Sequence, residues 1–293
     1  VSSAANNYDR PLVVTECYGG INNMPVANLY KEAMDQFAKG INSMVPHAVW
    51  YRPTNIIFQP DLSPRSAGYG AHLAEYNRYI GRLQRLLQGG RHVADIAVLY
   101  PIATLQAGYY FGPGKPYEGG VIPPEADYME VGERLSLTVR RDFTYLHPEV
   151  LEAQCTVAGG VLRLNNATNY ERFKVVIMPG SRTIQAGSLK KIKDFYDHGG
   201  ILIATTQLPE HAAEFGRDAE VRTTVADIFG TPLPKAPSTT NKAFRVRTNA
   251  AGGRAYFVSA PRSAALKAIL DEALPNGDVL FEQDLRTTGG NLS

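Results

Sequence analysis

Glu16 has the clearest potential for chemistry of any residue in this sequence. It lies near the end of a short apolar, β-branched run at residues 11–17 (PLVVTEC), a pattern typical of a buried strand. In barrels of alternating strands and helices, the reacting groups lie at the carboxyl ends of the strands. Enzymes that cleave glycosidic bonds need two carboxyl groups, one as acid and one as base or nucleophile. Glu16 is a candidate for one of them; alternatively, it is a structural glutamate paired with a basic neighbour.

His47, Trp50 and Tyr51 form a second group of candidates, in the next apolar run at 41–51 (INSMVPHAVWY). Aromatic faces stack on sugar rings, and an imidazole can hydrogen-bond a sugar hydroxyl. These three residues are therefore candidate substrate-binding residues. The alternative is that they only cover the rim of the fold.

The elements that carry these residues alternate between strand and helix. Strands are predicted at 11–17 and 41–51, and helices at 28–39 and 71–87. Such an order favours parallel strands joined by right-handed crossovers. Two strand–helix units cannot close a barrel, which needs eight. They are therefore either an appendage or the last units of a barrel whose other units lie elsewhere.

A new series of elements begins at the apolar run 93–100, after a Gly-Gly stop. Its alternation predicts a flavodoxin-like, mostly parallel sheet covered on both faces. We therefore predict two domains, residues 1–91 and 92–293. Asp127 is expected to cap a helix at 127–146, with Glu130 completing a variant capping box. The other predicted elements are strands at 173–178, 201–205 and 279–281, a short strand or hairpin at 153–164, a hairpin at 244–258, and helices at 188–197, 221–229 and 263–274.

Composition and motifs exclude several other functions. The 30 basic and 28 acidic residues nearly balance, which gives no argument for a nucleic-acid or anionic-membrane partner, and no apolar run could span a bilayer. Two cysteines and six unpaired histidine positions match no metal site, and no phosphate-loop or dinucleotide fingerprint is present. We expect no metal and no cofactor. A glutamine amidotransferase would need a cysteine on a strand-to-helix elbow, and the strand at 201–205 leads into TQLP instead.

Three segments together resemble the α-L-rhamnosidase-type glycoside hydrolases and their bacterial relatives. These are VVTECYGG (13–20), GINSMVPH (40–47) and ADIAVLYP (94–101), with a further likeness at DFTYLHPEVL (142–151). The resemblance implies that the first domain holds the C-terminal strand–helix units of a TIM-type catalytic barrel. It implies a class I glutamine amidotransferase-like domain after it, without the nucleophile. Carried over by position, Glu16 is the general base or nucleophile and His47 a substrate-site residue.

The resemblance also sets expectations for the whole protein. The chain opens on Val1 and closes on LRTTGGNLS, and we expect an internal piece of a larger enzyme, inactive alone because the acid partner of Glu16 lies on an earlier strand. The parent is expected to cleave terminal sugars, such as α-L-rhamnosides, from polysaccharides in the periplasm or outside the cell. Its partner is a carbohydrate substrate, with neither nucleic acid nor membrane. The alternative is a non-catalytic α/β module for scaffolding or assembly. The sugar and its linkage, the stereochemical outcome, the identity of the acid partner, the oligomeric state and the binding of a structural calcium ion stay open.

Overall fold

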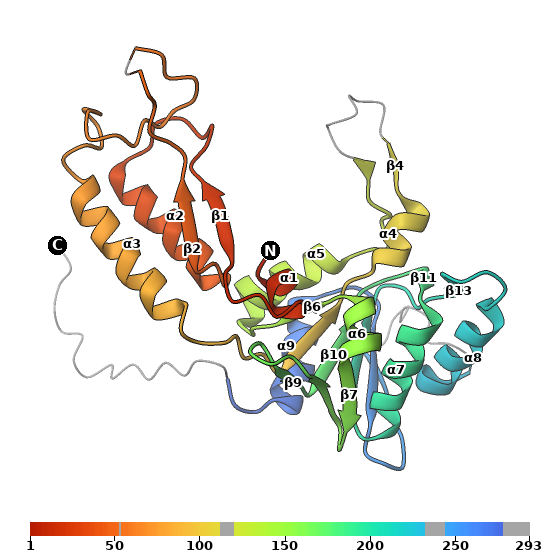
Figure 1. Ribbon diagram of the computed structural model, residues 1–293. Helices are drawn as coiled ribbons and strands as arrows, with labels where there is room; N and C mark the ends of the chain where they lie inside the picture. Colours follow the sequence, from red (N-terminus) through yellow and green to blue (C-terminus); the bar gives the residue numbers. More distant parts are fainter. Residues whose placement is uncertain (53, 112–119, 232–243, 278–293) are drawn as a thin grey trace. The chain divides into compact units, whose positions relative to one another are not determined.

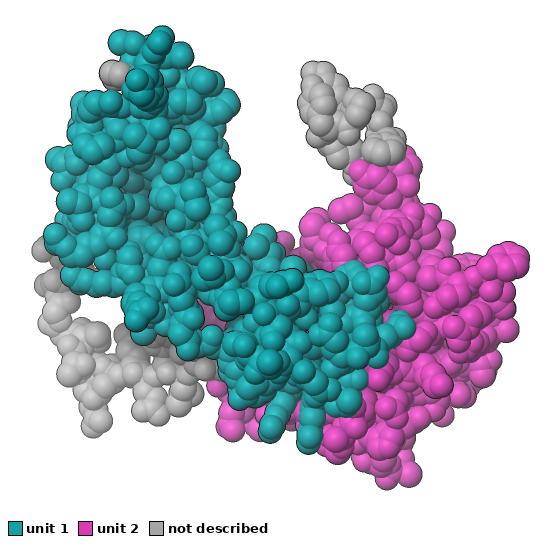
Figure 2. Space-filling view, viewed as in Figure 1, with its two compact units in different colours: residues 1–93, 145–156, 163–172 teal, residues 94–144, 157–162, 173–293 magenta. Residues whose placement is uncertain are grey.

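The computed structural model describes residues 1–52, 54–111, 120–231 and 244–277. The chain folds into two compact units (Figure 2). The first comprises Val1–Val93, Tyr145–Thr156 and Arg163–Arg172, and the second Ala94–Thr144, Val157–Leu162 and Phe173–Ser293. The domain division at residues 91 and 92 stays a prediction. The strand predicted at 279–281 lies outside the described residues.

The first unit is built around two parallel strands and two helices (Figure 1). Strand β1 (Val14–Cys17) pairs with β2 (Ser43–Pro46), with Glu16 opposite Val45. Helices α2 (Val26–Ala38) and α3 (Leu73–Leu87) share one apolar core with the strand residues Val13, Cys17 and Met44. Only one face of the strand pair is therefore covered by these helices.

The apolar spacing of the two helices explains how they reach this core. The buried residues of α2 recur at intervals of four, and those of α3 at three and four, which places each set on one helix face. They are Leu29, Ala33 and Phe37 in α2, and Leu73, Tyr76 and Ile80 in α3. After α2, the chain turns at Gly40 with a φ of +88°, a conformation that glycine adopts without steric penalty.

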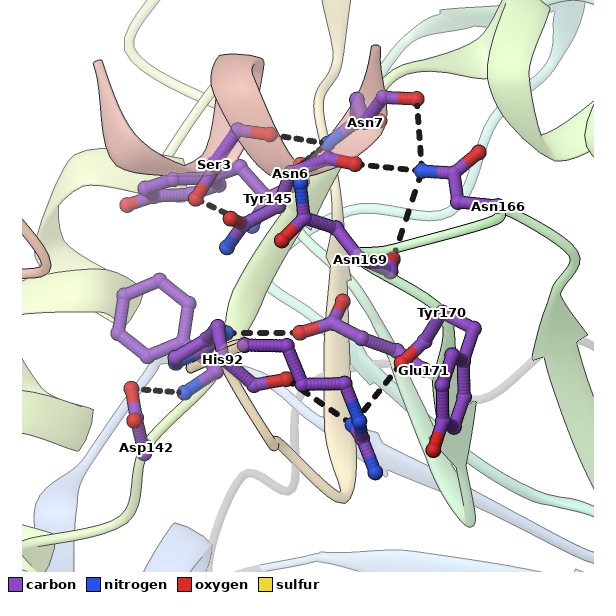
Figure 3. Close-up of polar contacts among 12 residues, drawn as sticks. Ser3, Asn6, Asn7, His92, Asp142, Tyr145, Asn166, Asn169, Tyr170 and Glu171 are labelled. Atoms are coloured by element: carbon purple, nitrogen blue, oxygen red, sulfur yellow. Dashed lines mark hydrogen bonds and ion pairs between the residues drawn. The ribbon is translucent and has the colours of Figure 1, made fainter. Parts of the chain in front are cut away.

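The first ten residues are held to later segments of the same unit by a buried polar network (Figure 3). The Asn7 amide donates to the carbonyl oxygens of Ser3 (2.6 Å) and Tyr145 (2.7 Å), and the Asn166 amide donates to the Asn6 carbonyl (2.6 Å). Asn7 itself is buried. Because buried polar groups are costly unless paired, this network fixes the path of the amino-terminal segment.

The sheet at the centre of the second unit has the strand order β14-β15-β12-β10-β3, followed by β6, of which only the first residue, Thr144, belongs to this unit. Strands β3 (Ile96–Leu99), β10 (Val175–Met178), β12 (Ile201–Thr205) and β15 (Arg254–Val258) run parallel, and β14 (Arg245–Thr248) pairs antiparallel to β15. All four residues of β3 and of β10 are buried, as expected for strands covered on both faces. The predicted α/β class with mostly parallel strands is confirmed.

The remaining elements complete the described chain. The helices are α1 (Ser2–Asn7), α4 (Ile102–Gly108), α5 (Tyr128–Glu133), α6 (Pro148–Gln154), α7 (Ala186–Asp197), α8 (Asp218–Phe229) and α9 (Ser263–Ala273). The short strands are β4 (Tyr110–Phe111), β5 (Gly120–Val121), β6 (Thr144–Leu146), β7 (Cys155–Ala158), β8 (Val161–Leu164), β9 (Glu171–Phe173), β11 (Thr183–Ile184) and β13 (His211–Ala212).

One helix prediction is wrong in its extent and in its cap. The helix predicted at 127–146 is α5, followed by a π-helix over Arg134–Val139 that ends where Arg140 adopts a φ of +59°. Residues 144–146 instead form β6, an edge strand next to β3, because the left-handed conformation of Arg140 has already ended the helical run. Asp127 precedes α5 but makes no side-chain cap bond, since its carboxylate accepts hydrogen bonds from other strand ends.

We predict that Asp9→Asn destabilises the chain at neutral pH. The Asp9 carboxylate accepts hydrogen bonds from the backbone N–H groups of Ala167 (3.0 Å), Thr168 (3.1 Å) and Asn169 (2.7 Å), which lower the pKa of Asp9. Its stabilising contribution is therefore complete above about pH 4 and is lost as pH falls through the lowered pKa. We expect a loss of about 1–2 kcal/mol at pH 7, roughly 3–6 °C in Tm.

Thermal unfolding at pH 7, 4 and 3 measures this effect, with Asp35→Asn as the control: the difference in Tm should persist from pH 7 to 4 and shrink at pH 3. Asp35 forms only an exposed pair with Lys39, so its removal should change Tm by less than about 1 °C. An Asp9→Asn variant with the same Tm as the original chain at pH 7 would contradict the prediction.

Candidate functional site

Glu16 and His47 lie side by side at the carboxyl ends of the two parallel strands of the first unit. The distance between Glu16 Oε1 and His47 Nε2 is 3.8 Å. The backbone N–H of His47 donates to the Cys17 carbonyl oxygen at 2.8 Å. The Glu16 side chain is 69% exposed. An exposed carboxylate and an imidazole at this distance contribute little to stability. The carboxylate is therefore available to a ligand or to a water molecule.

Two aromatic rings, those of Trp50 and Phe58, gather next to this pair. The His47 ring lies edge-on to Trp50, with 5.6 Å between centroids, and Phe58 lies 5.9 Å from His47 and 6.0 Å from Trp50. Glu16 thus lies next to His47, and the His47 ring packs against Trp50. The substrate-binding role of these residues stays a prediction. Tyr51 is 93% exposed and contributes no ring contact to this cluster among the described residues.

The aromatic cluster contains two buried nitrogen atoms without a hydrogen-bond partner among the described residues. They are His47 Nδ1 and Trp50 Nε1. Such atoms are uncommon in folded proteins, because an unpaired buried donor costs free energy. The backbone around them is fixed, since the Arg65 guanidinium donates to the Trp50 carbonyl oxygen at 2.6 Å.

The turn after β1 shapes the space beside Glu16. Tyr18 has a φ of +72°, and its hydroxyl donates to the Leu29 carbonyl oxygen at 2.8 Å and bonds the Tyr76 hydroxyl at 2.6 Å. A Cβ at Gly19 would lie 3.3 Å from Cγ of His47, tighter than most Cβ contacts. Glycine at this position therefore lets the His47 ring pack directly against the turn.

Sequence reasoning did not single out Phe58, Tyr18, Tyr76 or the buried pair of Asp61 and Ser63. The Ser63 hydroxyl donates to Asp61 Oδ2 at 2.8 Å. Phe58, which is half exposed, and Asp61, which is buried, lie in a proline-rich segment without helical or strand periodicity, so the sequence gives no signal of where they lie. The glycines after Tyr18 indicated a turn, but nothing local indicated that its ring would reach α3.

Burial controls the ionisation of the groups under the site. Desolvation first, and then the charges of Glu32 and Glu16, raise the pKa of the Cys17 thiol to about 12. Desolvation also raises the pKa of Tyr76, to about 12, and that of Tyr18. These groups are therefore neutral at physiological pH, and Cys17 is no nucleophile. Cys17 and Cys155 are both buried thiols.

The second unit carries a separate polar cluster at the ends of its strands. The Asp127 carboxylate accepts hydrogen bonds from the Gly180 N–H (2.7 Å) and from the hydroxyls of Thr205 (2.9 Å) and Thr206 (2.6 Å). Desolvation raises the pKa of Asp127, while these hydrogen bonds oppose the rise. Thr206, directly after β12, has a φ of +52°, unusual for a β-branched residue. The position at which an amidotransferase would need a cysteine thus holds a threonine engaged by a carboxylate.

The described residues show neither a cluster of metal-ligating side chains nor a membrane-spanning helix. They include no group of three or more His, Cys, Asp or Glu side chains able to hold a metal ion. None of the described helices is long and apolar enough to cross a membrane.

We predict that Gly19→Ala displaces the His47 ring without unfolding the chain. The added methyl group would approach the ring to 3.3 Å, so the imidazole must move by a few tenths of an ångström. The His47 side-chain NMR signals should shift, while Tm changes by only a few degrees. Gly68→Ala is the matched control, because a Cβ there meets nothing within 4 Å. Unchanged His47 signals would contradict the packing described for this turn.

Comparisons with known proteins bear on the family and on the fold. The chain aligns with a rhamnosidase structure from Novosphingobium sp. PP1Y at 19% identity and a TM-score of 0.62, over 94% of this chain and 24% of that one. It aligns with the structure of a GH42 beta-galactosidase from G. stearothermophilus at 12% identity and a TM-score of 0.59, over 95% of this chain and 46% of that one. It also aligns with a beta-galactosidase structure from Bacillus circulans sp. alkalophilus at 12% identity and a TM-score of 0.58, over 93% of this chain and 47% of that one. At these identities the structures indicate a shared fold, and no curated protein matches the sequence. Residues 1–252 match glycoside hydrolase family 106, described as alpha-L-rhamnosidase, and the chain therefore belongs to this family of rhamnosidase-type glycoside hydrolases.

Proposed function

We propose that this chain is part of an enzyme that hydrolyses terminal sugars, α-L-rhamnosides foremost, with Glu16 as its general base or nucleophile. The observation that carries the proposal is the meeting of Glu16 and His47 at the carboxyl ends of adjacent parallel strands, 3.8 Å apart. Reacting groups of (β/α) barrels lie at this end of their strands. The family match supports the same reaction.

We infer that β1 and β2 are the last strands of a barrel completed by other parts of the protein. In the described residues their sheet has two strands only, and the face opposite the helices carries the exposed apolar residues Val14 (48%) and Val45 (53%). Parallel strands are ordinarily covered on both faces. The chain also spans only 24% of the aligned rhamnosidase. On this proposal the acid partner of Glu16 lies on another barrel strand.

The proposed ligand is a carbohydrate held by His47 and Trp50, with Tyr51 as a further contact. The edge-on rings provide an apolar surface of the kind that stacks on sugars, and the unpartnered nitrogens His47 Nδ1 and Trp50 Nε1 can donate to ring hydroxyls after a small rearrangement. Polysaccharides are the proposed natural substrates, and a periplasmic or extracellular location follows from their size.

We propose a scaffolding role, without chemistry of its own, for the second unit. Numbered in chain order, β3, β6, β10, β12 and β15 are strands 1 to 5. Across the sheet from β6 to β15 their order is 2-1-3-4-5, which is the flavodoxin-like order. This supports an amidotransferase-like domain. The absence of a cysteine after β12 and the engagement of Thr206 by Asp127 argue against glutaminase chemistry. This role is compatible with a catalytic first unit.

In the complete enzyme, Glu16→Gln should lower kcat for rhamnoside hydrolysis by roughly 10²–10⁴-fold or more, with KM changed little. The amide has the shape of the carboxylate but can neither accept a proton from water nor attack the anomeric carbon. The assay uses nitrophenyl glycosides, with rhamnoside and galactoside compared.

Glu32→Gln is the matched control, because Glu32 is an exposed glutamate on α2 that bonds only Gln36 among the contacts described. The Glu32→Gln enzyme should have the same kcat as the original enzyme. A Glu16→Gln enzyme with full activity would leave Glu16 as a structural residue and end this assignment.

The 293-residue chain alone should hydrolyse none of these glycosides, although Glu16 is intact. On the barrel proposal it lacks the acid partner, and Glu16 is hydrated where a closed site would exclude water. Purified chain at micromolar concentration, assayed for hours against the complete enzyme as positive control, tests this. Turnover that Glu16→Gln abolishes would overturn the inference that the site is incomplete.

A further inference from the structure

The alternation of side chains along β1 breaks after Cys17, at the second residue beyond Glu16. Val13 and Cys17 point into the core with the helices, whereas Val14 and Glu16 are exposed on the other face. If the strand continued regularly, Tyr18 would lie on the same face as Glu16, two residues away. Instead Tyr18 is 4% exposed and belongs to the core on the helix side. Two consecutive residues, Cys17 and Tyr18, thus enter the same core.

A left-handed backbone conformation produces this break. Tyr18 has a φ of +72°, which a bulky L-residue rarely adopts. Residues held in such conformations persist when the surrounding structure over-determines them, and they concentrate at functional sites. Contacts with the rest of the fold must therefore hold Tyr18 in this conformation.

Two hydrogen bonds between buried groups hold the Tyr18 ring in the core. Its hydroxyl donates to the Leu29 carbonyl oxygen in α2 (2.8 Å) and bonds the Tyr76 hydroxyl in α3 (2.6 Å). The two rings meet edge to face, with centroids 6.4 Å apart. Since Tyr18 donates to Leu29, the Tyr76 hydroxyl is the donor in the second bond. Loss of either hydroxyl leaves a buried partner unsatisfied.

The consequence is an unobstructed surface next to Glu16. The ring that regular alternation would place beside the Glu16 carboxylate lies on the opposite side of the sheet. The same turn sets His47, because Cys17 accepts from the His47 N–H at 2.8 Å and Gly19 packs against the imidazole ring. The positions of Glu16 and His47 therefore both depend on the conformation of Tyr18.

We propose that Tyr18 and Tyr76 are positioning residues: their hydroxyl pair locks the left-handed turn that orients Glu16 and keeps its face free for the sugar. This inference rests on the proposed function, because it assigns the pair a role in glycoside hydrolysis through Glu16. Neither tyrosine contacts the substrate. Both act through the backbone that carries the carboxylate.

The test compares Tyr18→Phe and Tyr76→Phe in the complete enzyme, with Tyr79→Phe as the control. Tyr79 lies on the same helix, but its hydroxyl contacts only the Met34 sulfur among the bonds described. We expect kcat for rhamnoside hydrolysis to fall roughly 10- to 100-fold in the first two variants with KM changed less than about threefold, because misplacement of a reacting group by about 1 Å has such an effect. Tyr79→Phe should keep the original kcat. All rates are measured well below the Tm of each variant.

The double variant Tyr18→Phe/Tyr76→Phe tests whether the two hydroxyls act as one unit. If one bond between the hydroxyls is responsible, the double variant should have about the same kcat as either single variant rather than the product of both losses. Where Tyr18→Phe fails to fold, Tyr76→Phe alone decides the question, because it breaks the same bond from the other side. Multiplying losses, or a fall in Tm with unchanged kcat, would overturn the proposal.

Glu16→Gln in the same series distinguishes failure of this inference from failure of the proposed function. If Glu16→Gln is inactive while Tyr18→Phe and Tyr76→Phe keep the original kcat, Glu16 is catalytic and the tyrosine pair is only structural. If Glu16→Gln is fully active, the proposed function fails, and the inference fails with it.

Discussion

The parallel pairing of β1 with β2 is the constraint on which the candidate site depends. Its register places Glu16 opposite Val45 and lets Cys17 accept a hydrogen bond from His47. A slip of one residue would turn Glu16 into the core and Cys17 to the open face, since side chains alternate along a strand. The helix core excludes that slip, because it accommodates Cys17 and Met44 but not a charged carboxylate.

Each unit uses an aspartate to join segments that are distant in sequence. Asp9 accepts three backbone N–H groups from residues 167–169, and Asp127 accepts one N–H and two hydroxyls from the ends of β10 and β12. Charge-assisted bonds are stronger than neutral ones, and they saturate carboxylate oxygens that would otherwise need water. Glu16, by contrast, is left largely to solvent. Its carboxylate is thus the one of these three that stays available for a reaction.

Membership of the rhamnosidase-type family explains a combination that either unit alone would leave puzzling. Among the described residues, a two-stranded parallel sheet with an exposed apolar face is an unusual end point for a folded domain. On the function proposed above, the first unit would supply a strand-end carboxylate to a larger glycoside hydrolase, and the second unit would serve as a scaffold.

Much of this organisation could be predicted from the sequence alone, because local patterns determine which segments become strands and helices. The apolar runs before Glu16 and His47, the helical spacing of Leu29, Ala33 and Phe37, and the buried strands at 173–178 and 201–205 all indicated their elements, and hence the α/β class. The position of Glu16 at a strand end followed from the same pattern. The strand at 144–146 did not, since the helical run ends earlier, at the left-handed conformation of Arg140. Only the tertiary structure could decide that Phe58 joins His47 and Trp50, that Asp127 bonds two other strand ends rather than its own helix, and that Tyr18 turns away from Glu16. Each of these arrangements depends on groups that are distant in the sequence. The Tyr18 hydroxyl bonds the hydroxyl of a residue 58 positions away, and Tyr18 has a positive φ. The residues next to Tyr18 in the sequence contain no pattern that predicts this conformation.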